Sequence, residues 1–155
     1  MAEEYAIEMR GITKTFGSVV ANKDVNLTLR RGEILALLGE NGSGKTTLMN
    51  MLSGIYQPDG GEIFVEGKSV SIHSPQEAKR LGIGMVHQHF KLVEVFSAAD
   101  NIWMGKEKAG FLLKKDRYAQ IETMAKKFGF DIDPKKKVKN MAVSEKQTLE
   151  IIKVL

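Results

Sequence analysis

A glycine-rich loop between an apolar run and a helix-compatible run most constrains the fold of this 155-residue chain. Residues 34–38 are all apolar, which predicts a strand covered on both faces. The pattern Gly39-x-x-x-x-Gly44-Lys45-Thr46 follows directly, and residues 45–52 favour a helix. Strand, glycine loop and helix in this order are typical of a P-loop, so the sequence predicts an α/β fold.

The residue types in this loop suit a bound phosphate chain. Backbone N–H groups of the loop and the N-terminus of the next helix favour the β-phosphate. The Lys45 ammonium reaches the β- and γ-phosphates, the Thr46 hydroxyl ligates Mg²⁺, and Thr47 is placed to bond the α-phosphate. The candidate nucleotide-binding residues are Gly39, Glu40, Asn41, Gly42, Ser43, Gly44, Lys45, Thr46 and Thr47.

The alternative is a glycine-rich surface turn that binds nothing. The predicted strand before the loop and helix after it favour the nucleotide-binding interpretation, because a P-loop requires that context. Kinases and small GTPases share this loop. The motif therefore predicts the ligand but not the activity.

Hydrophobic alternation predicts strands on either side of the loop. Residues 5–16 and 21–29 alternate as half-buried strands of an antiparallel sheet. A short strand is expected at 62–65, and another at 83–86.

Helix signals dominate the rest of the chain. Ser74, Pro75 and Glu77 predict a capped helix that ends near residue 81, and Ser97 begins a second helix in the same way. Helical spacing of apolar residues predicts helices over 114–128, followed by a glycine C-cap, and over 143–155.

Composition excludes several classes. Without cysteine there is no disulfide framework or thiolate metal site, and no signal peptide or apolar run long enough to span a bilayer is recognised. The net charge is +4, and the basic stretch at 135–139 has no interleaved aromatic residues. We therefore expect a solvated surface there and no nucleic-acid binding.

With these motifs, the chain resembles the nucleotide-binding subunit of ABC transporters over essentially its whole length. The loop Gly-Glu-Asn-Gly-Ser-Gly-Lys-Thr-Thr-Leu at 39–48 is similar to that family's Walker A motif. The resemblance implies a P-loop NTPase (ABC-type ATPase) core with an N-terminal antiparallel β subdomain and a helical subdomain, here incomplete. The implied division is 1–33 and 62–72 for the β part, 34–60 for the P-loop core, 83–90 for the Q-loop strand and 97–155 for the helical subdomain.

The resemblance assigns two further ATP-binding residues. Phe16 matches the aromatic residue that stacks on adenine, although in an alternating stretch it would by itself be taken for a core residue. Gln88 matches the Q-loop glutamine, which contacts Mg²⁺ together with Thr46. The neighbouring His87 and His89 flank this loop more plausibly than they bind a metal.

The resemblance also identifies a departure from the family. The signature motif, commonly Leu-Ser-Gly-Gly-Gln, corresponds to Met141, Ala142, Val143, Ser144 and Glu145. Ala142 replaces the serine that contacts the γ-phosphate held by the opposing subunit. Ser144 places a side chain where the family has its second glycine. We therefore expect weakened signature action.

The family's partners are implied as well. Residues 90–104 correspond to the surface that receives transmembrane permease subunits, and Phe96 and Trp103 are candidate contacts there. Residues 55–61 and 145–147 most resemble the N-terminal cassette of tandem-cassette sugar and nucleoside importers. The expected protein couples ATP to uptake at the cytoplasmic face of the membrane, with a second cassette and, indirectly, an extracytoplasmic solute-binding protein.

The family's Walker B strand, catalytic glutamate, D-loop and switch histidine are expected beyond the signature segment, so no catalytic residue is assigned here. We expect residues 1–155 alone to bind nucleotide weakly and to hydrolyse it little or not at all.

Three other functions are compatible with parts of this pattern. A soluble ABC-type ATPase acting on ribosomes or DNA shares the loops but lacks a permease surface. A P-loop kinase would lack the signature-like segment at 141–147. A pure binding module would have no role in energy coupling.

Overall fold

The computed structural model describes residues 5–87, 90–104 and 114–155. The chain forms two compact units, Met1–Gly84 and Met85–Leu155. Each is described by itself.

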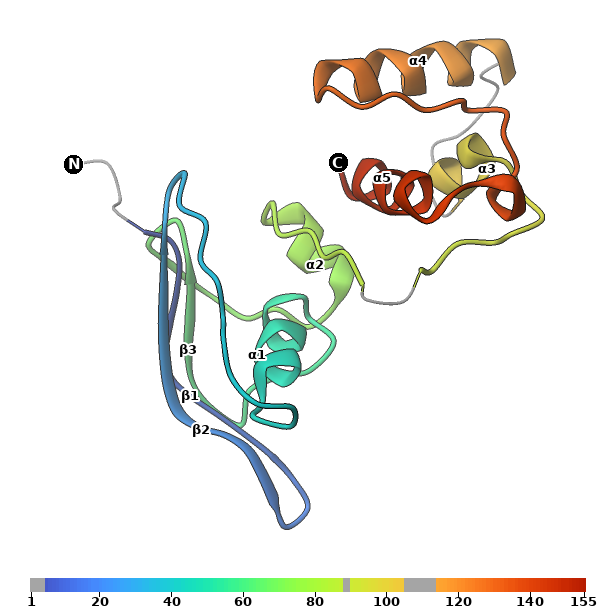
Figure 1. Cartoon of the computed structure of the whole chain (residues 1–155). Helices are drawn as coiled ribbons and strands as arrows, with labels where there is room; N and C mark the ends of the chain where they lie inside the picture. The colour runs from blue at the N-terminus through green and yellow to red at the C-terminus, as the bar shows by residue number, and fades with distance from the viewer. Residues whose placement is uncertain (1–4, 88–89, 105–113) are drawn as a thin grey trace. The chain divides into compact units, whose positions relative to one another are not determined.

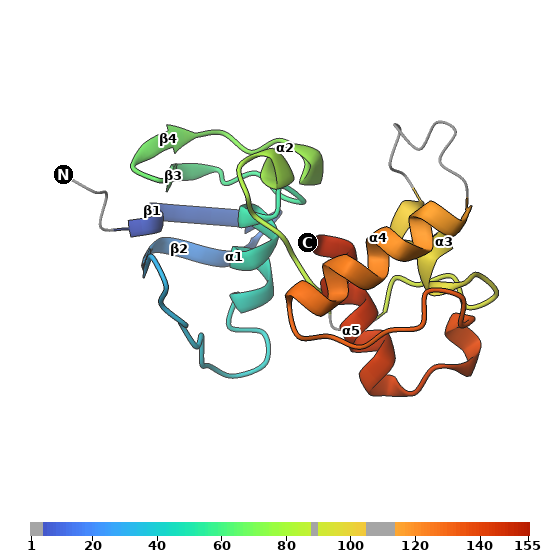
Figure 2. The same cartoon turned by 90° about the horizontal axis from the view of Figure 1, so that it is seen from above.

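The first unit is built on a four-stranded antiparallel sheet. Its strands are β1 (Tyr5–Phe16), β2 (Val19–Arg30), β3 (Gly60–Val65) and β4 (Lys68–Val70), in the order β2-β1-β3-β4 (Figure 2). Over residues 25–30 of β2, the apolar side chains are half-buried and the polar ones between them are exposed, as the alternation predicts, whereas Val19 and Val20 are exposed. The sheet therefore has one covered face.

Two helices cover that face. They are α1 (Lys45–Leu52) and α2 (Pro75–Arg80), and Figure 1 shows both beside the sheet. Apolar side chains from the sheet and the helices form one core: Met9, Ile12, Leu48, Met51, Ile63, Ile72 and Ala78. This packing fixes α1 against the sheet.

The strand expected at 34–38 is absent. These residues are irregular in the structure, and Ile34 and Leu38 are 97% and 89% exposed. A strand needs a hydrogen-bonded neighbour, and none of the described residues pairs with this segment. The apolar run predicts burial, but no neighbouring strand in the described part of the chain provides it.

The prediction of a Q-loop strand at 83–90 is wrong as well, because the described residues of this segment also lack a neighbouring strand. Residues 83–87 and 90 are irregular and unpaired among the described residues, and Val86 is 48% exposed. Residues 88 and 89 lie outside the described residues. One missing strand precedes the glycine loop, and the other leads into the predicted Q-loop.

Caps begin the short helices largely as predicted. The Ser74 hydroxyl accepts a hydrogen bond from the Glu77 N–H at 3.3 Å, while the Glu77 carboxylate accepts from the His73 N–H and not from Ser74. The capping box is therefore half formed at α2. At α3 (Ala98–Trp103) both halves form between Ser97 and Asp100.

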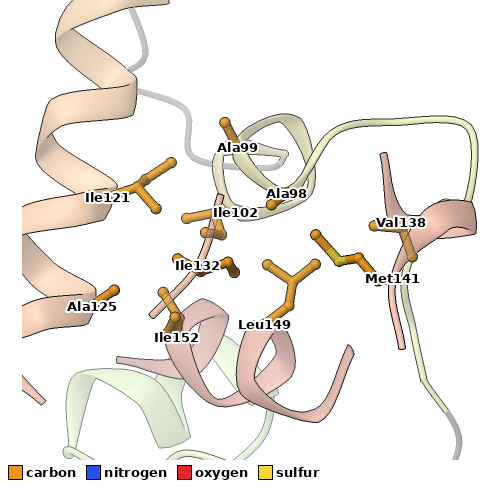
Figure 3. Packing of buried hydrophobic residues seen from close by; sticks show 10 residues of the cluster. All are labelled: Ala98, Ala99, Ile102, Ile121, Ala125, Ile132, Val138, Met141, Leu149 and Ile152. Atoms are coloured by element: carbon orange, nitrogen blue, oxygen red, sulfur yellow. The ribbon is translucent and has the colours of Figure 1, made fainter. Parts of the chain in front are cut away.

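The second unit is helical. With α3 it contains α4 (Lys114–Lys127), the short 3₁₀ helix η1 (Val138–Asn140) and α5 (Val143–Val154). Figure 3 shows the shared core, formed by Ala98, Ala99, Ile102, Ile121, Ala125, Ile132, Val138, Met141, Leu149 and Ile152. Among the described residues, no helix combines the length and apolar character needed to cross a bilayer.

Two buried polar side chains hold the segment that follows residue 90. The Glu150 carboxylate accepts from the Lys91 N–H at 2.7 Å, and the Asn101 side-chain oxygen accepts from the Val93 N–H at 2.7 Å. Glu150 and Asn101 are 3% and 1% exposed. Since a buried polar group without a partner is costly, these bonds fix the path of residues 91–93 against α3 and α5.

Replacing Leu149 by alanine tests the core of the second unit. Leu149 is fully buried, so Leu149→Ala should lower the free energy of unfolding by about 2–5 kcal/mol. Val143, on the same helix, is 65% exposed, and Val143→Ala should change it by less than about 0.5 kcal/mol. Urea denaturation followed by circular dichroism measures both. Equal losses would contradict the described packing.

Candidate phosphate-binding site

Helix α1 begins without a side-chain cap. Gly44 occupies the N-cap position with φ of 85°, and no side chain bonds the first turn. In contrast, Ser74 and Ser97 cap α2 and α3. The first N–H groups of a helix have no intrahelical partner, and together with the helix dipole they favour an anion. The loop therefore presents uncapped donors at its end.

The Lys45 ammonium lies within the loop. Its Nζ donates to the Gly39 carbonyl at 2.8 Å and to the Glu40 carbonyl at 2.6 Å. A third, longer bond reaches the Ser43 hydroxyl at 3.2 Å. These three acceptors match the three donors of an ammonium group. The loop carbonyls thus satisfy the hydrogen-bond donors of the Lys45 ammonium. Phosphate oxygens are also hydrogen-bond acceptors, so they could replace these carbonyls.

A close backbone contact fixes the end of the loop. A Cβ at Gly44 would lie 2.3 Å from the Ala21 carbonyl oxygen, so only glycine fits there. Asn22, 6% exposed, donates from Nδ2 to the Gly44 carbonyl at 3.4 Å. The sequence does not single out Asn22, since a polar residue in an alternating strand looks like one on the wet face. Its contact with the loop comes from the tertiary structure alone.

The other predicted loop residues lie at the surface. Asn41, Gly42 and Thr46 are exposed and Thr47 is half-buried. Thr46 stands in the first turn of α1, where the motif requires a metal ligand. Gln88, its predicted partner in Mg²⁺ binding, lies outside the described residues. These assignments remain predictions.

Phe16 lies at the surface and not in the core. Its side chain is 42% exposed, and its ring meets Tyr56 edge-on, with the centroids 5.1 Å apart. The Lys14 ammonium lies 5.5 Å from the centroid of the Phe16 ring. The exposed fraction leaves ring surface for a ligand, which suits the role implied by the family resemblance.

Asp59 bonds the strand just before Phe16. Its carboxylate accepts from Lys14 Nζ at 2.7 Å and from the Thr15 N–H and hydroxyl at 2.7 and 2.8 Å. These bonds, that from Lys14 first, lower the pKa of Asp59 from its usual 3.8 to about 2. The sequence marks Asp59 only as part of a turn, so its role was not anticipated.

The signature-like segment forms the start of α5. Met141 is buried in the core of the second unit, whereas Ala142, Val143 and Ser144 are exposed. Ala142 occupies the N-cap position but has no oxygen to cap with. The Glu145 carboxylate accepts from the Ala142 N–H at 2.7 Å and pairs with Lys136 Nζ at 2.8 Å. The hydrogen bond from Lys136 is the main cause of the lowered pKa of Glu145.

The two aromatic residues predicted to contact a partner differ in the structure. Phe96 is 43% exposed, so its ring is available at the surface. Trp103 is half-buried, packs against the core of the second unit and stacks near the Arg117 guanidinium, 5.7 Å from the ring centroid. Trp103 therefore contributes at least partly to packing.

His87 is half-buried, and His89 lies outside the described residues. Within the described ranges, no three acidic, histidine or cysteine side chains come together as a metal site.

Curated relatives resemble nearly all of the chain. A sequence model of the family described as ABC transporter matches residues 22–155. The guanosine import ATP-binding protein NupO of Bacillus subtilis is 49% identical over 154 residues, which are 98% of this chain and 30% of that protein. The galactose/methyl galactoside import ATP-binding protein MglA of Salmonella typhimurium is 45% identical over 97% of this chain and 30% of its own length. The chain thus spans about 30% of these relatives.

Solved structures share the fold. The cassette cbiO1 of Clostridium perfringens, part of the ABC transporter complex cbiONQ, has a TM-score of 0.78 and 25% identity, covering 98% of this chain and 61% of that one. A nucleotide-free ATP-binding cassette from an ABC transporter has a TM-score of 0.80 and 21% identity, covering 97% and 64%. These likenesses confirm the predicted fold class.

Alanine substitutions at two loop glycines test the close contact with β2. Gly42 and Gly44 have φ of 84° and 85°, so either alanine is strained by about 1–2 kcal/mol. Only Gly44→Ala also forces a methyl group against the Ala21 carbonyl, since nothing lies within 4 Å of a Cβ at Gly42. We expect a lower midpoint of thermal unfolding for Gly44→Ala than for Gly42→Ala, measured by calorimetry. Equal midpoints would contradict the contact.

The lowered pKa of Asp59 predicts a pH dependence of stability. The folded-state pKa of about 2 lies below the usual 3.8, so the stabilising contribution is present above that usual value and is lost as the pH falls towards 2. The difference in unfolding free energy between the wild type and Asp59→Asn should therefore be constant near neutral pH and shrink over this acidic range. Urea denaturation at a series of pH values measures it. A constant difference throughout would contradict the described bonds.

Proposed function

Because this chain belongs to the ABC transporter family, whose sequence model matches residues 22–155, we propose that it is the ATP-binding, energy-coupling part of an importer. One observation carries the proposal: α1 begins uncapped after a glycine loop in which Lys45 is held by loop oxygens. Uncapped N–H groups with the Lys45 ammonium beside them suit a polyphosphate.

The residues of the loop fit Mg-ATP. The N–H groups at 39–47 and the Lys45 ammonium bind the phosphates, and Lys45 exchanges its loop acceptors for phosphate oxygens. Thr46, exposed in the first turn of α1, and Gln88 would hold Mg²⁺, and Phe16 would stack on the adenine. Bound Mg-ATP supplies the free energy of phosphoryl transfer to water. We retain the sequence-based domain division as part of the proposal: 1–33 with 62–72 for the β part, 34–60 for the P-loop core, 83–90 for the Q-loop, without the strand predicted there, and 97–155 for the helical subdomain.

The signature-like segment makes a weaker γ-phosphate contact than the family motif does. Ala142 supplies no hydroxyl, and Ser144 places a side chain where close approach is needed. The carboxylate of Glu145 is already engaged by Lys136 and the Ala142 N–H, which supports a structural role for this position. Half of the ATP sites in the assembled transporter are therefore expected to be less active.

The solute is a sugar or a nucleoside. Support comes from the relatives, whose names describe import of guanosine, nucleosides and galactose. The partners are transmembrane permease subunits, a second cassette and, indirectly, an extracytoplasmic solute-binding protein. The chain works at the cytoplasmic face of the membrane, and its exposed Phe96 belongs to the permease surface.

Replacing Lys45 tests nucleotide binding. Lys45→Ala removes a charge-assisted contact worth about 1.5–3 kcal/mol, so affinity for Mg-ATP should fall by roughly tenfold or more. Amide chemical shifts at 39–47 should respond to Mg-ATP in the wild type, as measured by NMR titration. Lys68→Ala removes the same charge from exposed β4 and should leave binding unchanged. Undisturbed loop amides in the wild type would refute the proposal.

Affinity purification from detergent-solubilised membranes tests the importer assignment. The full chain should recover transmembrane permease subunits, and Phe96→Asp should reduce the yield by placing a charge on the contact surface. Recovery of ribosomes or DNA-bound complexes in their place would favour a non-transport ATPase.

A further inference from the structure

We propose that Asp59 is a positioning residue for nucleotide binding, which fixes the base of the β1–β2 hairpin so that Phe16 is held at a set distance from the phosphate loop. The inference rests on the proposed function, because it assumes that Phe16 stacks on a base. It assigns Asp59 a task beyond holding a turn.

Asp59 continues the sheet beyond the end of a strand. The strand β3 begins at Gly60, paired with Thr13 of β1, and the Asp59 N–H extends that pairing by donating to the Thr13 carbonyl at 2.8 Å. At Thr15, further along β1 towards the hairpin tip, β3 no longer provides a partner. There the Asp59 carboxylate accepts from the Thr15 N–H at 2.7 Å, as a neighbouring strand would. The Asp59 side chain thus takes the place of a main-chain acceptor for β1 just beyond the end of β3.

Beyond that point the hairpin has only two strands. Phe16 pairs with Val19 at its tip, and both side chains are largely exposed, at 42% and 62%. A two-stranded ribbon is marginally stable in water by itself. Besides the edge contact of Phe16 with Tyr56, the direction of the tip therefore depends on how firmly the hairpin is held at Lys14 and Thr15, the two residues that Asp59 bonds.

The opposite side of the hairpin base touches the phosphate loop. Lys14 pairs across the hairpin with Asn22, which is buried and donates to the Gly44 carbonyl. At the same level, the Ala21 carbonyl leaves no space for a Cβ at Gly44. The hairpin base is thus held by Asp59 on one side and by the end of the loop on the other.

The segment that contains Asp59 also leads back to α1. Tyr56, whose ring meets Phe16 edge-on, donates its N–H to the Asn50 carbonyl of α1 at 3.2 Å. Residues 55–59 therefore connect the helix that carries Lys45 to the strand that carries Phe16. Both ends of a nucleotide, the base and the phosphates, would contact elements joined by this one segment.

A double-mutant cycle on the full chain separates positioning from general stabilisation. Phe16→Ala should weaken Mg-ATP binding by about tenfold, since stacking of a base on an aromatic ring contributes roughly tenfold or more to affinity. Asp59→Ala should weaken it about three- to tenfold, and the double variant should match Phe16→Ala, because Asp59 acts through the ring. Binding of Mg-tripolyphosphate, which has no base, should change less than about twofold in all three variants. Isothermal titration calorimetry measures each affinity.

Controls keep the test independent of folding. Glu62→Ala removes an exposed carboxylate from the same sheet and should leave both affinities unchanged. Asp59→Asn retains an oxygen for the Thr15 N–H but loses the ion pair with Lys14, so its effect on Mg-ATP affinity should lie between those of the wild type and Asp59→Ala. This variant serves as the test if Asp59→Ala does not fold. Circular dichroism verifies that each variant is folded at the assay temperature.

Each outcome decides a different claim. An Asp59 effect that persists in the Phe16→Ala background, or that weakens tripolyphosphate equally, would overturn the positioning role. The same holds if Phe16→Ala weakens Mg-ATP but neither Asp59 variant does. If Phe16→Ala leaves Mg-ATP affinity unchanged, the stacking role in the proposed function fails first. If tripolyphosphate and Mg-ATP both fail to bind the wild type, the phosphate site itself is refuted.

Discussion

The close approach of β2 to Gly44 sets the geometry of the phosphate loop. The Ala21 carbonyl occupies the space that a side chain at residue 44 would need. The end of the loop and the start of α1 therefore lie directly against β2. Buried side chains of α1 secure the helix on the same face, while its first turn stays uncapped. A helix that is fixed by its apolar side and open at its N-terminus presents its first N–H groups to an anion.

A second constraint acts on the apolar segment before the loop. Residues 34–38 carry the composition of a buried strand, yet Ile34 and Leu38 are almost fully exposed. Because strand structure depends on a hydrogen-bonded neighbour, composition alone cannot produce it. Exposed apolar segments of this kind are also liable to associate with other chains. The start of the loop is therefore held by Lys45, which bonds the Gly39 and Glu40 carbonyls, and not by a strand at 34–38.

Polar contacts organise the second unit around the signature-like segment. The Glu145 carboxylate accepts from the Ala142 N–H at the start of α5 and pairs with Lys136, which joins the start of this helix to the segment before it. Further along α5, the buried Glu150 holds the Lys91 N–H. The helix that begins with the signature-like residues thus also fixes the chain just after the predicted Q-loop.

The sequence by itself determined the features that depend on neighbours within a few positions. Helix starts at Ser74 and Ser97 and the glycine loop before Lys45 follow from hydrogen bonds that span three to six residues, so they can be predicted from spacing. Only the tertiary structure decided that 34–38 is unpaired, that Asn22 reaches Gly44 and that Asp59 bonds Lys14, a residue 45 positions away. Those outcomes depend on which distant segments contact each other in space, and the local periodicity of the sequence does not predict such contacts.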